Sequence, residues 1–204
     1  MTFNYDTLLE QALDRIDIPL KTMMDYTSGP LYEVIKLHGS IDWRYWIPNT
    51  EVGILQSQQP HSREVVRAAP VVGKEPIVER DGTTPEEFKQ RVLFSLPALA
   101  IPTASKTSFV CPAAHVDSLK KSIPAVSKIA IIGWRGGERT FLELLSQGLK
   151  NPVQVIAACG NADAAEATLG RLSSAGIKGD FQAAPGGFTD FVVNRRIEPF
   201  LSAV

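Results

Sequence analysis

The sequence has few of the features that mark several classes of protein. Only two of its 204 residues are cysteines. Cys111 and Cys159 lie far apart in the chain, so they provide neither a disulfide framework nor a four-cysteine zinc site. A reducing compartment therefore suits the chain best.

An excess of one charge and a long apolar run are also missing. Lys and Arg number 21 against 22 Asp and Glu, so the formal net charge is −1. The chain thus lacks the positive charge that nucleic acids and anionic membranes attract. The longest strongly apolar stretch, residues 129–132, is too short to span a membrane, and the acidic N-terminal residues do not form a leader. We expect a cytoplasmic protein without general nucleic-acid binding.

The composition that is present is that of a globular protein, with 44% hydrophobic and 21% charged residues. Strand, turn and helix alternate in the C-terminal half. Strands are predicted over 128–132, 153–158 and 179–182, and helices over 141–149, 164–175 and 188–201. This alternation indicates a mainly parallel sheet covered by helices, which is a three-layer α/β fold.

The N-terminal half is less regular. Residues 1–3 read as a clipped strand, Asp6 as the N-cap of a helix, and residues 31–37 as a second strand that ends at His38. Residues 44–92 have scattered Val and Pro and a polar stretch over 56–63, which indicates an insertion. We predict a single α/β domain over 1–204 with an insertion at 44–92.

Candidate chemistry lies where the predicted strands end. These segments are Asn4-Tyr5-Asp6, His38-Gly39-Ser40, residues 133–137 and Cys159-Gly160-Asn161. Ligands of open parallel sheets bind beyond the carboxyl ends of the strands, and glycines there let backbone approach a ligand closely. By contrast Cys111 and His115, although four residues apart, are too few for a zinc site, and we expect them to pack in the interior.

Two of these segments together resemble a known family. Thr2-Phe3-Asn4-Tyr5-Asp6 and Lys36-Leu37-His38-Gly39-Ser40 resemble the paired catalytic signatures of the sirtuin superfamily, most closely its bacterial sirtuin-like branch. Residues 130–134, which lead into 141–145, resemble a later strand-glycine-helix element of that branch. The resemblance reaches from residue 2 to about 150 apart from the insertion. It implies a sirtuin-like nucleotide-binding fold, NAD as ligand or substrate, and a context such as defence against phage.

The resemblance also implies roles for single residues. Asn4 would hold a ribose hydroxyl or the attacking water, and His38 would accept a proton, since an imidazole ordinarily titrates near neutrality. Without the resemblance, a histidine before glycine at a strand end is more often simply a turn residue. Asp6 either stabilises positive charge and orients Asn4 or only caps a helix.

The other cofactor-binding candidates are Gly133, Arg135 and Asn161. Gly133 would let backbone approach the dinucleotide. Arg135 either contacts a diphosphate or is solvated or paired with Glu138. Asn161 either meets the adenosine ribose or is an ordinary turn residue beside glycine. These alternatives stay open from the sequence alone.

The chain departs from the family pattern in two respects. It has no pair of Cys-x-x-Cys motifs, which implies no zinc and favours NAD hydrolysis over lysine deacylation. Its glycine pairs at 136–137 and 186–187 lack the G-x-G-x-x-G context of a phosphate-binding loop, so we expect that an N-terminal segment or a partner protein supplies it. The sequence therefore predicts either an NAD glycohydrolase that binds NAD weakly by itself or a non-catalytic remnant that binds a nucleotide or a protein.

Overall fold

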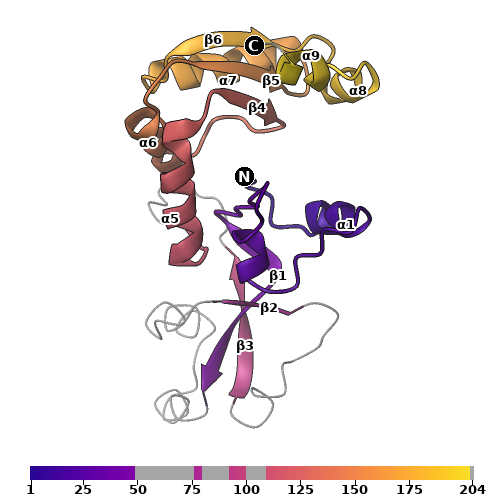
Figure 1. Ribbon diagram of the computed structural model, residues 1–204, viewed down its shortest axis with the longest axis vertical. Helices are drawn as coiled ribbons and strands as arrows, with labels where there is room; N and C mark the ends of the chain where they lie inside the picture. The colour runs from indigo at the N-terminus through magenta and orange to yellow at the C-terminus, as the bar shows by residue number, and fades with distance from the viewer. Residues whose placement is uncertain (49–75, 80–91, 100–108, 203–204) are drawn as a thin grey trace. The chain divides into compact units, whose positions relative to one another are not determined.

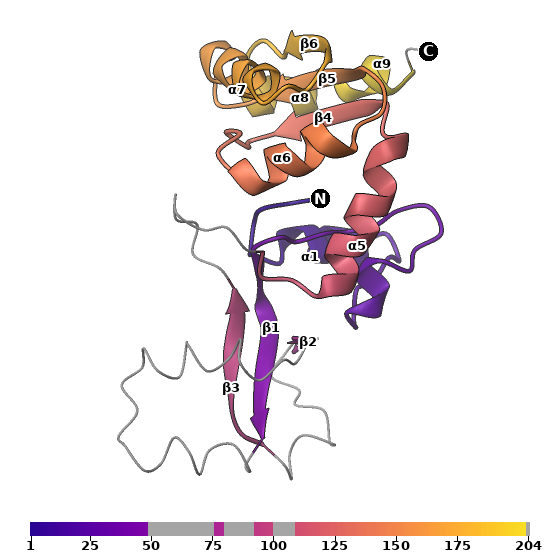
Figure 2. The same ribbon diagram turned by 90° about the vertical axis from the view of Figure 1, so that its left-hand side faces the viewer.

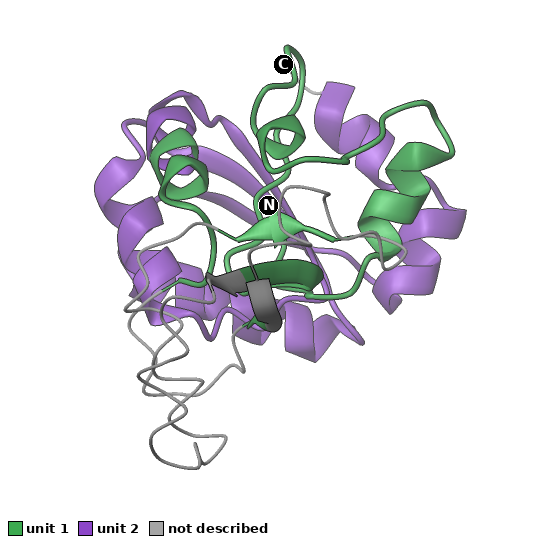
Figure 3. Ribbon diagram, turned by 90° about the horizontal axis from the view of Figure 1, so that it is seen from below, with its two compact units in different colours: residues 1–103, 108–118 green, residues 104–107, 119–204 purple. Residues whose placement is uncertain are grey.

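The structure is a computed structural model, and it describes residues 1–48, 76–79, 92–99 and 109–202. The chain divides into two compact units (Figure 3). Unit 1 comprises residues 1–103 and 108–118, and unit 2 comprises residues 104–107 and 119–204. Each unit is described by itself, and the single domain expected over 1–204 stays a prediction.

Unit 1 is built on an antiparallel sheet of order β2-β1-β3. Its strands are β1 (Gly39–Pro48), β2 (Ile77–Val78) and β3 (Val92–Leu99), and β1 and β3 form the long pair in Figure 1. The helical elements in the described part of unit 1 are α1 (Leu8–Asp14), a 3-10 turn (Met24–Tyr26) and the first residues of α5 (Ala113–Ser122). This antiparallel pairing differs from the mainly parallel sheet that the sequence predicts.

The predicted strand over 31–37 is wrong. Residues 31–35 belong to no strand, and Lys36 makes only an isolated parallel bridge to Thr2. The strand begins instead at Gly39, so His38 precedes a strand rather than ending one. Within the predicted insertion at 44–92, the structure describes the end of β1, the short strand β2 and the first residue of β3; residues 49–75 and 80–91, with the polar stretch 56–63, lie outside the described residues.

Gly39 is where the chain turns into β1. Its φ is +75°, and a Cβ at this position would lie 1.9 Å from the carbonyl oxygen of Ala98 on the neighbouring strand. Only glycine tolerates both the left-handed backbone and this close approach. The glycine after His38 is therefore required by the sheet itself.

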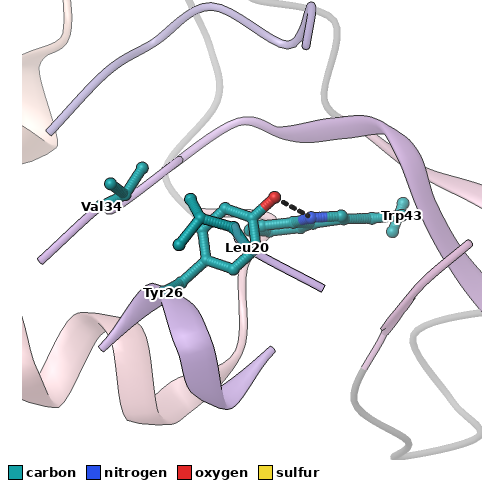
Figure 4. Close-up of a cluster of buried hydrophobic side chains, with 5 residues drawn as sticks. Leu20, Tyr26, Val34 and Trp43 are labelled. Carbon is teal, nitrogen blue, oxygen red and sulfur yellow. Dashed lines mark hydrogen bonds between the residues drawn. The ribbon is translucent and has the colours of Figure 1, made fainter. Parts of the chain in front are cut away.

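The core of unit 1 is a cluster of buried apolar and aromatic side chains (Figure 4). Its members are Leu20, Tyr26, Val34, Trp43 and Ala98. The ring of His115 stacks on that of Tyr26 with 5.7 Å between centroids, and Cys111 packs against the cluster. Burial raises the pKa of Cys111 to about 12, so it stays a thiol. The expectation that Cys111 and His115 pack in the interior is confirmed.

Unit 2 contains a parallel sheet of order β4-β5-β6, whose strands lie side by side in Figures 1 and 2. A 3-10 turn (Ile123–Ala125) leads to β4 (Lys128–Ile132), α6 (Arg139–Gly148), β5 (Val153–Ala158), α7 (Ala162–Ser174) and β6 (Gly179–Ala183). Strands joined through helices confirm the α/β class for this part of the chain, in a layout compatible with a Rossmann-like fold.

Helices cover both faces of this sheet. On one face α7 packs against β5 and β6, and the general preference for right-handed crossovers puts α6 on the same face. On the other face, Ile156 and Ala158 of β5 pack with Phe191 of α8 (Gly187–Val193) and with Phe200 of α9 (Ile197–Ser202). The expected helix over 188–201 is thus two helices. Arg195 breaks it by adopting a left-handed φ of +48°.

None of the helices within the described residues is long and apolar enough to cross a membrane.

Candidate functional site

Asn4 and His38 follow two chain segments that run parallel in unit 1. The amide of Thr2 donates to the carbonyl of Ile35 at 2.8 Å, and Thr2 bridges Lys36 in parallel. Two residues further along each segment stand Asn4, which is exposed, and His38, which is 8% exposed. The ring of Phe3, the residue before Asn4, tilts against the His38 ring, with centroids 5.2 Å apart. The structure therefore brings together the segments that carry the two predicted catalytic residues.

A buried ammonium group ties these two segments to each other. Lys36 is 1% exposed, and its Nζ donates to the Asp6 carbonyl, to Ser40 Oγ at 2.8 Å and to Glu10 Oε1 at 2.7 Å. All three protons of the ammonium group are thereby used. The main chain adds a further link, since the amide of Ile41 donates to the Tyr5 carbonyl at 2.8 Å. Lys36 thus fixes the turn after Asn4 against the turn after His38.

The counter-ion of Lys36 extends this network into the core. Glu10, on α1, is fully buried, and its Oε1 also accepts from the hydroxyl of Tyr26 at 3.0 Å. The Tyr26 hydroxyl in turn accepts from Trp43 Nε1 at 3.3 Å (Figure 4). We refer to Glu10, Tyr26, Lys36, Ser40 and Trp43 as the buried polar network. A buried ion pair repays the desolvation of its charges only with good geometry and further hydrogen bonds, which Lys36 Nζ and Glu10 Oε1 have. The other carboxylate oxygen, Glu10 Oε2, is buried and has no hydrogen-bond partner among the described residues.

Sequence reasoning missed Lys36 and Glu10 as parts of the site. Lys36 stands inside the quoted Lys-Leu-His-Gly-Ser segment, but its partner lies 26 residues earlier in the chain. The available signal was a lysine between the apolar residues Ile35 and Leu37, since lysine is almost never fully buried unless it is paired.

Asp6 is engaged in the local structure of the helix start. Its carboxylate accepts a hydrogen bond from the amide of Leu8 at 3.1 Å, within the turn that leads into α1. Thr7 is the residue at the cap position, where its side chain bonds Gln11 instead. The prediction that Asp6 is the N-cap is therefore wrong, because Asp6 lies one residue before the cap and its carboxylate stabilises the turn there.

The loop after β4 carries Gly133 and Arg135. Gly133 has a φ of +69°, its amide donates to the Ala158 carbonyl at 2.9 Å, and a Cβ there would meet no atom within 4 Å. The Trp134 carbonyl accepts from Thr168 Oγ1 at 3.4 Å, and Arg171 donates to the Arg135 carbonyl. The loop backbone is thus held by α7, while Gly133 remains open to a ligand.

The side chains of the loop after β4 and of the loop after β5 make different contacts. Arg135 is exposed, and Glu138 accepts from the indole nitrogen of Trp134. Asn161 is the N-cap of α7 and accepts from the Ala164 amide at 2.8 Å, which uses its carbonyl oxygen and leaves its amide group exposed. Asn161 therefore serves the helix whether or not it also binds a ligand.

The loop between β6 and α8 lies at the carboxyl edge of the unit 2 sheet, as do the loops after β4 and β5. Gly187, with φ +76°, begins α8, and a Cβ there would lie 2.8 Å from the Gly160 carbonyl oxygen. The glycine pair 186–187 therefore lets this loop approach the one that follows β5. Gly133, Asn161 and Gly187 all follow strands of the same parallel sheet.

Within the residues that the structure describes, no three His, Cys, Asp or Glu side chains gather in a way that would hold a metal ion. No protein-family model, no curated protein and no solved structure matches the chain.

Proposed function

We propose that the chain is a sirtuin-like NAD-binding domain that hydrolyses the bond between nicotinamide and ribose, with Asn4 and His38 as catalytic residues. The observation that supports the proposal is the pairing of the Asn4 and His38 segments in parallel, secured by Lys36. Preorganised polar groups of this kind contribute to catalysis because their positions need not be reorganised during the reaction.

The chemistry follows from the residue types. Cleavage of the glycosidic bond leaves its electron pair on the nicotinamide nitrogen and develops positive charge on the ribose. Water forms the new bond to the same ribose carbon and gives its proton to His38, so the products are nicotinamide and ADP-ribose. Asn4 has both a donor and an acceptor and orients the water or a ribose hydroxyl. Phe3 fixes the plane of the His38 ring through the contact at 5.2 Å.

Unit 2 carries three further candidates for contacts to NAD, which are proposed for that unit by itself. Gly133 offers an open backbone position, Arg135 an exposed guanidinium group for the diphosphate, and Asn161 an exposed amide group for the adenosine ribose. Asp6 acts in unit 1, where its hydrogen bond from the Leu8 amide holds the turn next to Asn4. A defence role against phage, which the resemblance implies, would use the same reaction to consume NAD.

The test is incubation of the chain with NAD and detection of released nicotinamide. The parent should release it, and His38→Gln should lower the rate by about 10²-fold or more, because glutamine keeps a polar group but accepts no proton. Asn4→Ala should lower it comparably. Asn151→Ala provides the matched control, since Asn151 is exposed in unit 2.

Two outcomes contradict the proposal. A folded parent that releases no nicotinamide above the blank but binds NAD would favour the non-catalytic nucleotide-binding remnant. A His38→Gln variant as fast as the parent would remove His38 from the mechanism.

A further inference from the structure

Unit 2 contains a groove of about 380 Å³ between the sheet and its last helix. Residues of β5 and β6 form its floor, and residues of α9 form one wall. The residues that matter for its chemistry are Gln154, Ile156, Asp180, Gln182, Arg196 and Phe200. None of them belongs to the candidate NAD residues, so this groove stands apart from the proposed function.

The polar floor residues share one face of the sheet. In the parallel register Gln154 lies beside Asp180, and Ile156 lies beside Gln182. Ile156 packs against α9, and residues two apart on a strand share a face, so all four lie on the side of α9. Neighbouring strands are about 4.8 Å apart, and residues two apart on one strand are about 6.6 Å apart. At these spacings the carboxylate of Asp180 and the carboxamides of Gln154 and Gln182 can reach the edge of one planar base together.

Gln154 is an unusual residue for its place. It is the one polar residue of β5, the central strand, and it is half-buried, with Lys128 and Asp180 beside it in register. Within the described part of the chain, the side chains of Gln154, Asp180 and Gln182 make no hydrogen bond. A half-buried amide on a central strand gains from a partner, because burial without one is costly.

The cations near the groove are already used. Arg196 forms an ion pair with Asp190 at 2.5 Å, and Lys128, next to Gln154 in register, donates to the carbonyls of Phe200 and Leu201 at 2.9 Å each. These bonds fasten α9 at both ends, so the wall is preformed. They also leave the carboxylate of Asp180 without a cation among the described residues.

We propose that this groove binds the base of a guanine nucleoside. The carboxylate of Asp180 accepts from the ring N–H and the exocyclic amino group of guanine together, which are neighbouring donors on one edge. The carboxamides of Gln154 and Gln182 donate to its carbonyl oxygen and ring nitrogen. The Phe200 ring contacts the face of the base. Adenine lacks the ring N–H on that edge and is rejected.

The experiment is titration of the full chain with guanosine, inosine and adenosine. Binding is measured by calorimetry and by the NMR chemical shifts of unit 2 amides. Guanosine should saturate. Inosine, which lacks the exocyclic amine, should bind about tenfold more weakly, and adenosine should not saturate. Asp180→Asn and Gln154→Leu should each weaken guanosine binding about tenfold or more. Asp163→Asn and Gln147→Leu, at exposed positions of α7 and α6, should bind as the parent does.

Asp180 is exposed, so its substitution leaves the fold intact even if Gln154→Leu does not. The proposal is overturned if guanosine does not saturate up to its solubility limit, or if adenosine binds equally well. It is also overturned if folded Asp180→Asn binds like the parent. Because the expected result does not depend on NAD hydrolysis, a failure of this proposal leaves the proposed function untouched.

Discussion

The interiors of the two units are stabilised by different kinds of contact. The buried polar and charged side chains of the described residues lie in unit 1, with Thr168 of unit 2 as the exception. Unit 1 contains a fully buried Glu10–Lys36 pair inside a hydrogen-bonded network, whereas unit 2 buries the apolar side chains of β5 between helices. Unit 1 therefore depends on exact hydrogen-bond geometry, and unit 2 on packed apolar area.

The largest effect should come from breaking the ion pair of unit 1. Lys36→Met leaves the fully buried carboxylate of Glu10 without its counter-ion, so the free energy of unfolding should fall by about 3–5 kcal/mol. Denaturant unfolding measures the loss, and hydrogen exchange should assign it to unit 1. Lys21→Met, at an exposed position, is the control. Equal loss of protection in both units would contradict the distinction drawn here.

A double variant separates the contribution of the Glu10–Lys36 pair to stability from its contribution to activity. Glu10→Leu together with Lys36→Met removes both charges, so much of the stability lost in Lys36→Met should return. If Lys36 positions the turns that carry Asn4 and His38, nicotinamide release should stay low in the double variant although its stability is restored. Recovery of both stability and activity would mean that the pair serves stability alone.

The corresponding change in unit 2 should be somewhat smaller. Leu172 of α7 is fully buried, and Leu172→Ala should cost about 3 kcal/mol by leaving a cavity. Hydrogen exchange should locate this loss in unit 2, the reverse of the result for Lys36→Met. Leu201→Ala, at a residue that is 60% exposed, should cost much less.

A smaller effect is expected at the N-cap of α7. Asn161→Ala removes the hydrogen bond to the Ala164 amide and should lower the free energy of unfolding by about 1 kcal/mol. Thermal unfolding beside Asn151→Ala measures it. A variant as stable as the parent would show that the cap contributes nothing.

The smallest effect is a dependence on acid pH. The hydrogen bond from Arg196 holds the pKa of the exposed Asp190 carboxyl below its usual value of 3.8. A carboxyl with a lowered pKa stabilises the folded state above its unfolded pKa and loses this contribution as pH falls through the folded value. Stability measured below pH 4 should therefore depend less on pH in Asp190→Asn. Parallel curves for parent and variant would contradict this.

The sequence predicts unit 2 well because its elements are local. The apolar run of β5 between turn residues predicts a strand with the observed bounds, 153–158. In unit 1 the same reasoning fails. Val34, Ile35 and Leu37 are buried without forming a strand, because the network around Lys36 and the sheet that begins at Gly39 decide their path. A contact such as that between Lys36 and Glu10 has no local pattern that predicts it.

The most direct test of the central claim is a nitrogen NMR spectrum of the histidine side chains during titration with NAD. The chain has three histidines, and His38→Gln assigns one set of resonances. NAD should shift the His38 resonances and leave those of His115, packed against Tyr26 in the core, unchanged. His38 resonances that stay constant at millimolar NAD, or that move no more than those of His115, would contradict the assignment of His38 to an NAD site.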